Sequence, residues 1–267
     1  MKLKHLTMSN ILSIKILSLV ILATAIFTST QASAEEQPPS GGWEFSTSVY
    51  LWGLSIGGET ADGEDIDIGF SDLWENLNFA VMTWVTARNG NWLVFGDVQY
   101  AHLEGDDSTT VNVGPGMELD ADLDLELTQW VIQAGGGYTV SRSSKHILDV
   151  FAGFRYLYQD SELEFDIGAT DIVKVDDSAD NIDAIIGVNS MLYLNEKWYL
   201  NSYLDVGTGE SNLTWQGMAL LGYQFNTFSA VMGYRYTYWD FDGDKGLGKD
   251  YDELDFSGPI VGATFRF

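Results

Sequence analysis

The sequence predicts an all-β fold: a transmembrane antiparallel up-and-down β-barrel of about ten strands, with short periplasmic turns and long acidic extracellular loops. Three observations predict it. Polar and apolar residues alternate along many segments, short and long connections alternate between those segments, and no segment after residue 34 is apolar over the roughly 20 residues that a membrane helix needs. In a barrel only every second residue of a strand faces lipid, so alternation replaces a continuous apolar run.

The last predicted strand shows this pattern most clearly. Taking every second residue back from the C-terminus gives Phe267, Phe265, Ala263, Val261 and Pro259, with small or polar residues between them. A strand that seals a membrane barrel, with lipid outside and a polar lumen inside, needs one apolar face of this kind.

At this point the chain resembles the outer-membrane β-barrel proteins of Gram-negative bacteria, whose final strand commonly ends in Phe. The resemblance implies that Phe265 and Phe267 form an assembly signal for the barrel-assembly machinery, and that the protein resides in the cell outer membrane. From residue 43 to residue 267 the chain is broadly similar to the small OmpA- and OmpW-like barrels. It has no motif that assigns it to one of them.

The first five predicted strands cover residues 43–54, 79–87, 92–102, 128–140 and 146–158. Each alternates aromatic or branched apolar residues with polar residues or glycine. The second strand leads through Asn89-Gly90, a tight-turn sequence, into the third, and residues 141–145 join the fourth to the fifth. In the fifth strand Phe154 and Tyr156 are predicted to face lipid and Arg155 the lumen.

The last five predicted strands cover residues 182–194, 198–206, 215–225, 228–238 and 254–267. Tight turns near 196 and 226 join the sixth to the seventh and the eighth to the ninth. In the ninth strand Tyr234 and Tyr236 flank Arg235, which the alternation places on the inner face.

The long connections cover residues 55–78, 103–127, 159–181, 207–214 and 239–253. Their alternation with tight turns is typical of outer-membrane barrels, and an even strand count returns Phe267 to the periplasmic side. Residues 122–127 and 162–175 extend existing strands or form another hairpin, so eight or twelve strands are alternatives. A short helix is predicted at Phe70–Leu77, with Ser71 as its N-cap, lying on the membrane surface or over the barrel mouth.

The N-terminus predicts export. Lys2 and Lys4 precede an apolar segment at residues 16–27, and cleavage is expected near Ala34, which leaves a signal peptide of residues 1–34 and a barrel domain of residues 35–267. The chain contains no cysteine, which excludes a lipidated N-terminal Cys and any disulfide.

The charge balance is strongly acidic and sorted by side. Cleavage removes Lys2, Lys4 and Lys15 but no acid, so the net charge falls from −26 to −29, which rules against nucleic acid as a partner. The long connections and the strand ends beside them hold 32 of the 39 acids. This pattern indicates solvated loops, or loops that attract cationic solutes or the divalent cations that bridge lipopolysaccharide.

The sequence offers only weak candidates for a metal site, namely Asp240, Asp242 and Asp244. The segment fails as a calcium loop because Lys245 replaces Gly at its sixth position and Tyr251 replaces Glu at its twelfth. No cofactor is predicted.

Seven ionisable residues are predicted to form a network in the lumen, namely Glu44, Asp97, Asp149, Arg155, Asp205, Arg235 and Arg266. Such residues either pack into a polar core that fills a small barrel or line a narrow water path that favours cations.

Catalysis is not predicted, and an outer-membrane hydrolase is the least favoured alternative. His102 and His146 are expected at opposite ends of the barrel, and the chain has no Gly-x-Ser-x-Gly elbow. Ten strands is also the count in the omptin proteases, but the Asp-x-His pair and the paired aspartates expected of omptins do not appear in matching context.

The predicted function is a structural or permeability element of the outer membrane, with a narrow cation-preferring pore for small solutes as its sharper form. The alternative is a surface-interaction protein whose acidic loops bind a partner or divalent-cation-bridged lipopolysaccharide. The expected partners are outer-membrane lipids and lipopolysaccharide, the barrel-assembly machinery and small cationic solutes.

Overall fold

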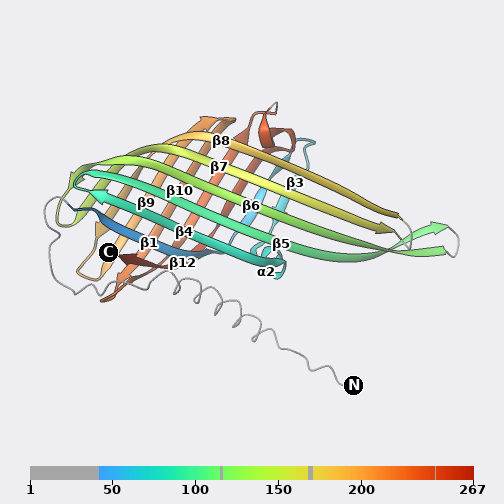
Figure 1. The fold of residues 1–267 in the computed structure, drawn as a ribbon, viewed down its shortest axis with the longest axis horizontal. Helices are drawn as coiled ribbons and strands as arrows, with labels where there is room; N and C mark the ends of the chain where they lie inside the picture. The colour runs from blue at the N-terminus through green and yellow to red at the C-terminus, as the bar shows by residue number, and fades with distance from the viewer. Residues whose placement is uncertain (1–41, 115–116, 168–170, 244) are drawn as a thin grey trace, which may run out of the picture. The chain divides into compact units, whose positions relative to one another are not determined.

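The computed structural model describes residues 42–114, 117–167, 171–243 and 245–267. The predicted signal peptide and its cleavage site lie outside these residues. The described chain forms one twelve-stranded antiparallel sheet, in which ten strands close into a barrel and two add to its rim (Figure 1). The sheet order is β1-β4-β5-β6-β7-β8-β9-β10-β11-β12-β2-β3, and the pairing of β1 with β12 closes the barrel.

The strands are β1 Glu44–Trp52, β2 Ser55–Thr60, β3 Asp65–Ile68, β4 Leu77–Asn89, β5 Trp92–Gly114, β6 Met117–Arg142, β7 His146–Ile167, β8 Asp171–Tyr193, β9 Trp198–Gly209, β10 Ser211–Gln224, β11 Ser229–Phe241 and β12 Tyr251–Arg266. The helices are α2 Phe70–Glu75 and the short 3-10 helix η1 Gly246–Lys249. The ten predicted strands and the tight turns between them are confirmed. Among the described residues, no helix is long and apolar enough to cross a membrane.

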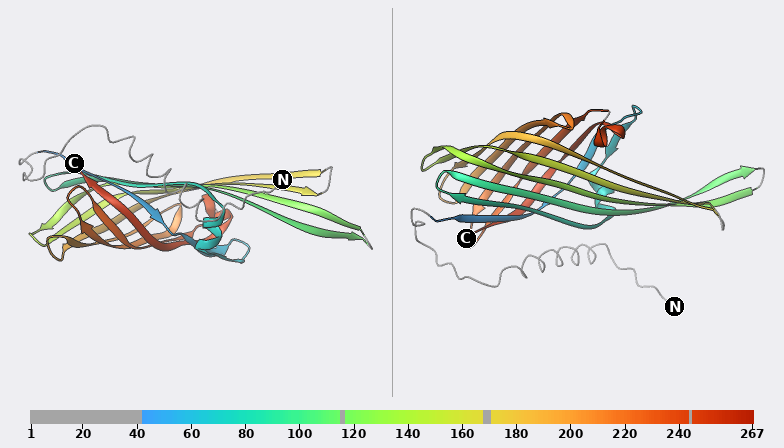
Figure 2. Two further views of the ribbon diagram at one scale, coloured as in Figure 1. Left: turned by 90° about the horizontal axis from the view of Figure 1, so that it is seen from below. Right: turned by 45° about the horizontal axis from the view of Figure 1, so that its top comes forward.

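Three of the predicted long connections are largely strand instead. At residues 207–214 only Glu210 separates β9 from β10. Strand β5 continues to Gly114 and pairs with β6 throughout, and β7 continues to Ile167 and pairs with β8 throughout. Figure 2 shows these four strands running beyond the rest of the barrel. The reason is visible in the sequence: the alternation of acidic and apolar residues persists through residues 118–127, so the strand period does not stop at the membrane.

The first predicted strand is interrupted at residues 53–54. Both β1 and β2 pair with β12, so together they form one barrel strand with a break, and β3 folds back onto β2 as a hairpin. A Cβ atom on Gly258 would lie 1.9 Å from the carbonyl oxygen of Gly53. Only glycine allows the two backbones to approach this closely at the break.

The helix was predicted over residues 70–77 and is confirmed at Phe70–Glu75, but the predicted N-cap is wrong. Gly69 is the N-cap and makes no side-chain cap. The N-cap lies two residues earlier than expected, so Ser71 lies inside the helix, where its hydroxyl donates to the Asp72 carboxylate at 3.5 Å. Leu73 packs against the buried apolar cluster of the barrel, so α2 folds over the barrel mouth.

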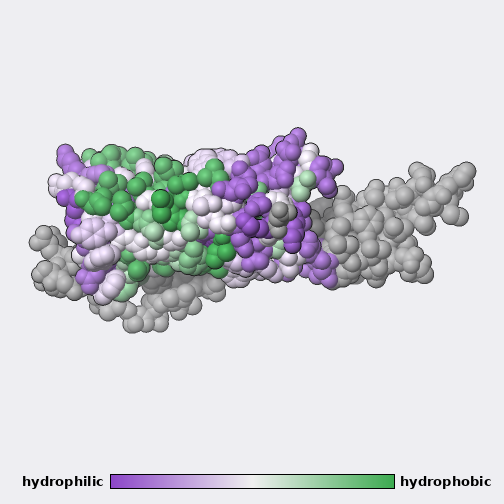
Figure 3. Space-filling view, turned by 90° about the horizontal axis from the view of Figure 1, so that it is seen from above, coloured by the Kyte–Doolittle hydropathy of each residue, from purple (hydrophilic) through white to green (hydrophobic). Residues whose placement is uncertain are grey.

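The outer wall carries an apolar band between two levels of paired aromatic side chains. At the extracellular level the pairs are Tyr100–Trp130 and Trp215–Tyr236, with ring centroids 4.5 and 4.9 Å apart, and at the periplasmic level they are Trp92–Tyr138 and Trp198–Tyr223, at 5.1 and 4.9 Å. Aromatic girdles of this kind mark the two membrane interfaces of a barrel. In Figure 3 the hydrophobic band gives way to a hydrophilic surface toward the extended strands.

The register of β7 predicts different tolerance at neighbouring positions. Phe154 is 42% exposed on the outer wall, whereas Arg155 is fully buried in the lumen. We expect Phe154→Arg to lower the free energy of unfolding by about 2–4 kcal/mol, because it places a charge near the middle of the bilayer. Urea unfolding in detergent measures this loss, with Phe154→Leu as control. Equal stability of the two variants would contradict the assigned faces.

The last residue completes the barrel. The Phe267 amide donates to the Phe45 carbonyl at 2.9 Å, and the Phe45 amide donates to the Phe267 carbonyl at 3.2 Å. We expect Phe267→Ser to reduce the amount of folded, heat-modifiable barrel in outer membranes, because it removes the terminal aromatic side chain of the closing strand. Phe267→Tyr keeps the ring and should assemble normally. Wild-type amounts of folded Phe267→Ser protein would refute the role of this residue.

Candidate functional site

Arg235 lies at the centre of the lumen and crosses it. From β11, its guanidinium donates to the Asp97 carboxylate on β5 at 2.8 Å and to the Gln133 side-chain oxygen on β6 at 2.9 Å. In the order of the ten barrel strands, β6 lies five strands from β11 in either direction. The contact with Gln133 therefore spans the full width of the barrel.

Three further side chains hold Arg235 and Asp97 in place. The Tyr50 hydroxyl donates to Asp97 at 2.6 Å, and Arg235 donates to the oxygens of Tyr50 and Gln216. The Arg235 guanidinium also stacks over Trp52, 4.9 Å from the ring centroid. A buried ion pair is stable only when further hydrogen bonds satisfy its remaining atoms, and this one has them.

Arg155 forms a second buried cluster. It donates to both Asp205 carboxylate oxygens at 2.6 and 2.7 Å and to the Thr214 hydroxyl at 2.6 Å. Its guanidinium lies 5.7 Å from the ring centroid of Trp239. These contacts join β7, β9, β10 and β11 across one side of the lumen.

An aromatic layer fills the lumen nearer the periplasmic turns. Trp84 on β4 stacks on Phe95 and meets Tyr203 on β9 edge-on, with ring centroids 5.4 and 5.5 Å apart, and Phe151 stacks on Tyr203 at 5.0 Å. Strands β4 and β9 are again five apart in the barrel. Side chains therefore meet across the full width of the lumen at two successive levels.

Five of the seven predicted lumen residues are buried in three ion pairs, two of which are linked by Gln133, whose side-chain oxygen accepts from Arg235 and whose side-chain nitrogen donates to Asp205 at 3.5 Å. Asp97 joins Arg235, Asp205 joins Arg155, and Asp149 joins Arg88, which donates to it at 2.7 and 3.0 Å near the periplasmic turns. The remaining two, Glu44 and Arg266, lie at exposed strand ends. Arg266 donates to Gln224 and lies over the Tyr199 ring.

Sequence reasoning placed Asp183 at the outer end of the sixth predicted strand but did not include it among the lumen residues. Asp183 is buried and accepts hydrogen bonds from the Asn181 side chain at 2.7 Å and the Ser211 hydroxyl at 2.9 Å. Asp183 is the cross-strand neighbour of Arg155. The period-two pattern of the sixth predicted strand could have placed it on the inner face.

The predicted metal candidates do not come together among the residues that the structure describes. Asp240 lies in β11, Asp242 pairs with Lys245 at 2.9 Å, and Asp244 lies outside the described residues. In the described part of the chain, no group of three or more His, Cys, Asp or Glu side chains is arranged to hold a metal ion.

The two histidines of the predicted barrel domain lie at opposite ends of the barrel. His102 contacts Glu104 and Thr128 at 3.1 Å each on the extracellular side, and His146 contacts Ser190 at 2.9 Å beside a periplasmic turn. Neither contacts the other, so they cannot act together on one substrate.

Directly beyond the extracellular aromatic level, four acids align across four neighbouring strands. Glu104 on β5 pairs with Glu126 on β6, Glu126 with Glu162 on β7, and Glu162 with Asp176 on β8. We call these four residues the acidic row. Three of them are exposed and Glu162 is half-buried. Directly opposed like charges destabilise a sheet, and His102 contacts one end of the row at Glu104.

Two further acids lie close together beside β8: Asp177, on the opposite face of β8 from the acidic row, and Asp250. Partial burial raises the pKa of Asp250 above its usual value, and the nearby Asp177 carboxylate raises it further. The extracellular end of the protein is therefore negative on more than one surface.

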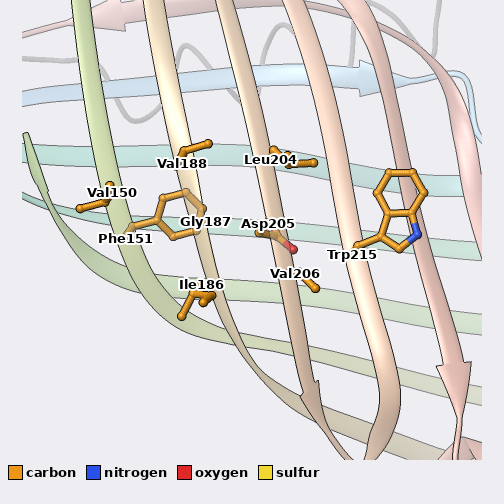
Figure 4. A pocket seen from close by; sticks show the side chains of 9 residues that line it. All are labelled: Val150, Phe151, Ile186, Gly187, Val188, Leu204, Asp205, Val206 and Trp215. Atoms are coloured by element: carbon orange, nitrogen blue, oxygen red, sulfur yellow. The ribbon is translucent and has the colours of Figure 1, made fainter. Parts of the chain in front are cut away.

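The outer wall also holds an apolar groove of about 560 Å³ over β7 to β10 (Figure 4). Its rim includes Val150, Ile186, Leu204 and Trp215. Asp205 contributes to the lining, but its carboxylate is bound by Arg155 inside the lumen. The groove lies in the apolar band of the outer wall.

Comparisons with known proteins agree with this architecture. No protein-family model matches the sequence, and no curated protein is significantly similar to it. The structure is similar to the outer membrane protease OmpT from Escherichia coli, with a TM-score of 0.54 and 10% sequence identity over 88% of this chain and 100% of that chain. This chain has the fold of an outer-membrane β-barrel.

Two further solved structures are weaker matches. The translocator domain of the autotransporter NalP from Neisseria meningitidis gives a TM-score of 0.45 with 11% identity, and covers 96% of each chain. Ail, the attachment invasion locus protein of Yersinia pestis, gives 0.36 with 11% identity over 86% of this chain and 100% of that chain. At such identities the likeness concerns the fold of this outer-membrane barrel alone.

The ion pair across the lumen should dominate the stability of the barrel. We expect Arg235→Ala to cost about 3–5 kcal/mol, because it leaves Asp97 buried without its cation. Arg88→Ala should cost less, because the Arg88 side chain is 17% exposed and water reaches its partner more easily. Reversible urea unfolding in detergent compares the two.

The double variant Arg235→Met with Asp97→Asn removes both charges and serves as control. It should be more stable than Arg235→Ala alone, since no unpaired charge remains. A double variant as unstable as the single one would show that the pairing of these charges is not what matters.

Proposed function

We propose that this outer-membrane barrel is a closed structural anchor whose acidic extracellular surface binds cationic ligands, either a basic partner or the divalent cations that bridge lipopolysaccharide. The observation that carries the proposal is the pair of contacts across the lumen, Arg235 with Gln133 and Trp84 with Tyr203. A barrel filled by its own side chains interacts with its surroundings through its outer surface.

The same contacts argue against a cation-preferring pore. An ion would have to displace both the Arg235 cluster and the aromatic layer, which lie in series along the lumen. The charged groups of the central cluster already satisfy one another, so none is left to line a water path. Small barrels are commonly filled in this way.

The acidic row supplies the binding surface. Cross-strand neighbours on one face have Cβ atoms about 4.5–5.5 Å apart, so the four acids repel one another. A bound cation or basic side chain relieves this repulsion, and the gain is largest at low ionic strength. The row lies just beyond the extracellular aromatic pairs, at the height of lipid headgroups.

Two measurements test the proposal. The purified protein should show no steady conductance in planar bilayers. A decalysine peptide should bind it, and the variant with Glu104, Glu126 and Glu162 changed to Gln and Asp176 to Asn should bind at least about 10-fold more weakly at 0.01 M salt. The difference should vanish near 1 M salt, where the Debye length is about 3 Å.

The control changes Glu44 and Glu196 to Gln, which removes two negative charges where the row variant removes four. Both residues are exposed near the periplasmic end, so the net charge shifts in the same direction without touching the row. Equal loss of peptide binding in the control would show that net charge, rather than the acidic row, attracts the ligand. Steady cation-selective conductance would overturn the closed-barrel part of the proposal.

A further inference from the structure

We propose that the free edge of β8 binds an extended basic segment of another protein by adding it to the sheet as a further strand. This inference rests on the proposed function and names the binding mode and the partner chemistry. The starting observation is that β8 pairs with β7 from Asp171 to Leu192 but pairs with β9 only from Asp183 onward. Among the residues that the structure describes, no strand pairs with its other edge over residues 171–182.

The backbone direction along this edge follows from its neighbours. The Ile182 amide donates to the Glu210 carboxylate at 2.8 Å, and the Ile182 carbonyl accepts from the Glu210 amide at 3.1 Å, so Ile182 directs its backbone groups away from β7. Backbone groups alternate sides along a strand, so Ser178 and Asp176 direct theirs to the free edge. Conversely, the Asp177 carbonyl faces β7, where it accepts from Ser161.

The chain itself already places backbone against part of this edge. A Cβ atom on Gly246, at the start of η1, would lie 2.3 Å from the Asp180 carbonyl oxygen, which shows how closely the two backbones approach. This turn covers the edge at Asp180. The unoccupied stretch is therefore residues 171–179, about nine residues and long enough for an added strand.

The charge of the surroundings selects a basic occupant. The stretch contains Asp171, Asp176 and Asp177 against one lysine, Lys174, and the acidic row ends on it at Asp176. In strand addition, main-chain hydrogen bonds give affinity and alternate side chains give specificity. A Lys- or Arg-rich strand would put its basic side chains beside the acids of β8.

A second copy of this chain is a poorer occupant. Edge-to-edge pairing of two β8 strands would bring the acids of both copies together, and opposed like charges disfavour such pairing. Acidic residues on an exposed edge commonly prevent this self-association. The same charges that block a second copy attract a basic strand.

The test compares two probe peptides on the full-length barrel in detergent at low salt. One is a ten-residue peptide of alternating lysine and threonine, and the other has the same sequence with alternate backbone nitrogens methylated. Methylation keeps the charge but removes hydrogen-bond donors, so we expect at least a 10-fold weaker fluorescence-anisotropy affinity for the methylated peptide. Equal affinities would overturn strand addition and leave the proposed function standing, whereas no binding of either peptide would overturn both.

Matched variants locate the edge. Ser178→Pro removes an amide that points to the free edge, and it should weaken binding of the unmethylated peptide about 10-fold, whereas Ser178→Ala should not change it. Ser108→Pro makes the same change on the other extended edge, that of β5, and should leave binding unchanged. Loss of binding in Ser108→Pro with none in Ser178→Pro would refute the assignment to β8. Heat-modifiability on gels shows that each variant is folded.

Discussion

The architecture depends on keeping buried charge paired inside a membrane. Arg235 and Asp97 are almost completely removed from solvent, and each is held by the other and by neutral partners on β1, β6 and β10. An unpaired charge in such a place costs several kcal/mol, so the pair and its neutral partners hold β5, β6 and β11 together across the lumen. The aromatic layer beneath the pair and the Arg155 cluster beside it also pack into the lumen. The lumen is thus closed by the same side chains that form hydrogen bonds and ion pairs with its buried polar groups.

The same two-residue period produces two chemically different outer surfaces along one strand. On β6, Trp130 and Ile132 face outward within the apolar band, and two steps beyond Trp130, past Thr128, the outward position is Glu126. The strand does not change its geometry at this boundary; only the residue type at the outward position changes, from apolar to acidic. A strand that continues into water with acids on one face stays soluble, but it leaves edges that β4 and β9 are too short to cover.

The sequence was sufficient for the strand count, the tight turns and the faces of strands such as β7, because period-two alternation and Asn-Gly turns are local signals. It was not sufficient for the strand extensions, because an acidic stretch between two apolar strands is equally compatible with a loop and with a strand in water. Nor did it show which inward charges meet: Glu44 and Asp97 share an inner face by period, but only the stagger between distant strands brings Asp97 to Arg235. Partners such as Tyr50 and Gln216 carry no local signal at all, because their role depends on strands far away in the sequence.

Charged residues are arranged differently in the lumen and on the extended part of the sheet. A ten-strand barrel is narrow enough for Arg235 and Trp84 to reach the opposite wall, so transport through it would require these contacts to break. Cross-strand pairing places the acids on the outward side of β5 to β8 side by side, and Glu104 also contacts His102 at 3.1 Å. Inside the barrel each buried carboxylate of an ion pair faces a cation, whereas in the acidic row the cross-strand neighbour of each acid is another acid. From this difference we infer that the lumen contacts stabilise the barrel, whereas the extended part of the sheet provides the proposed binding surface.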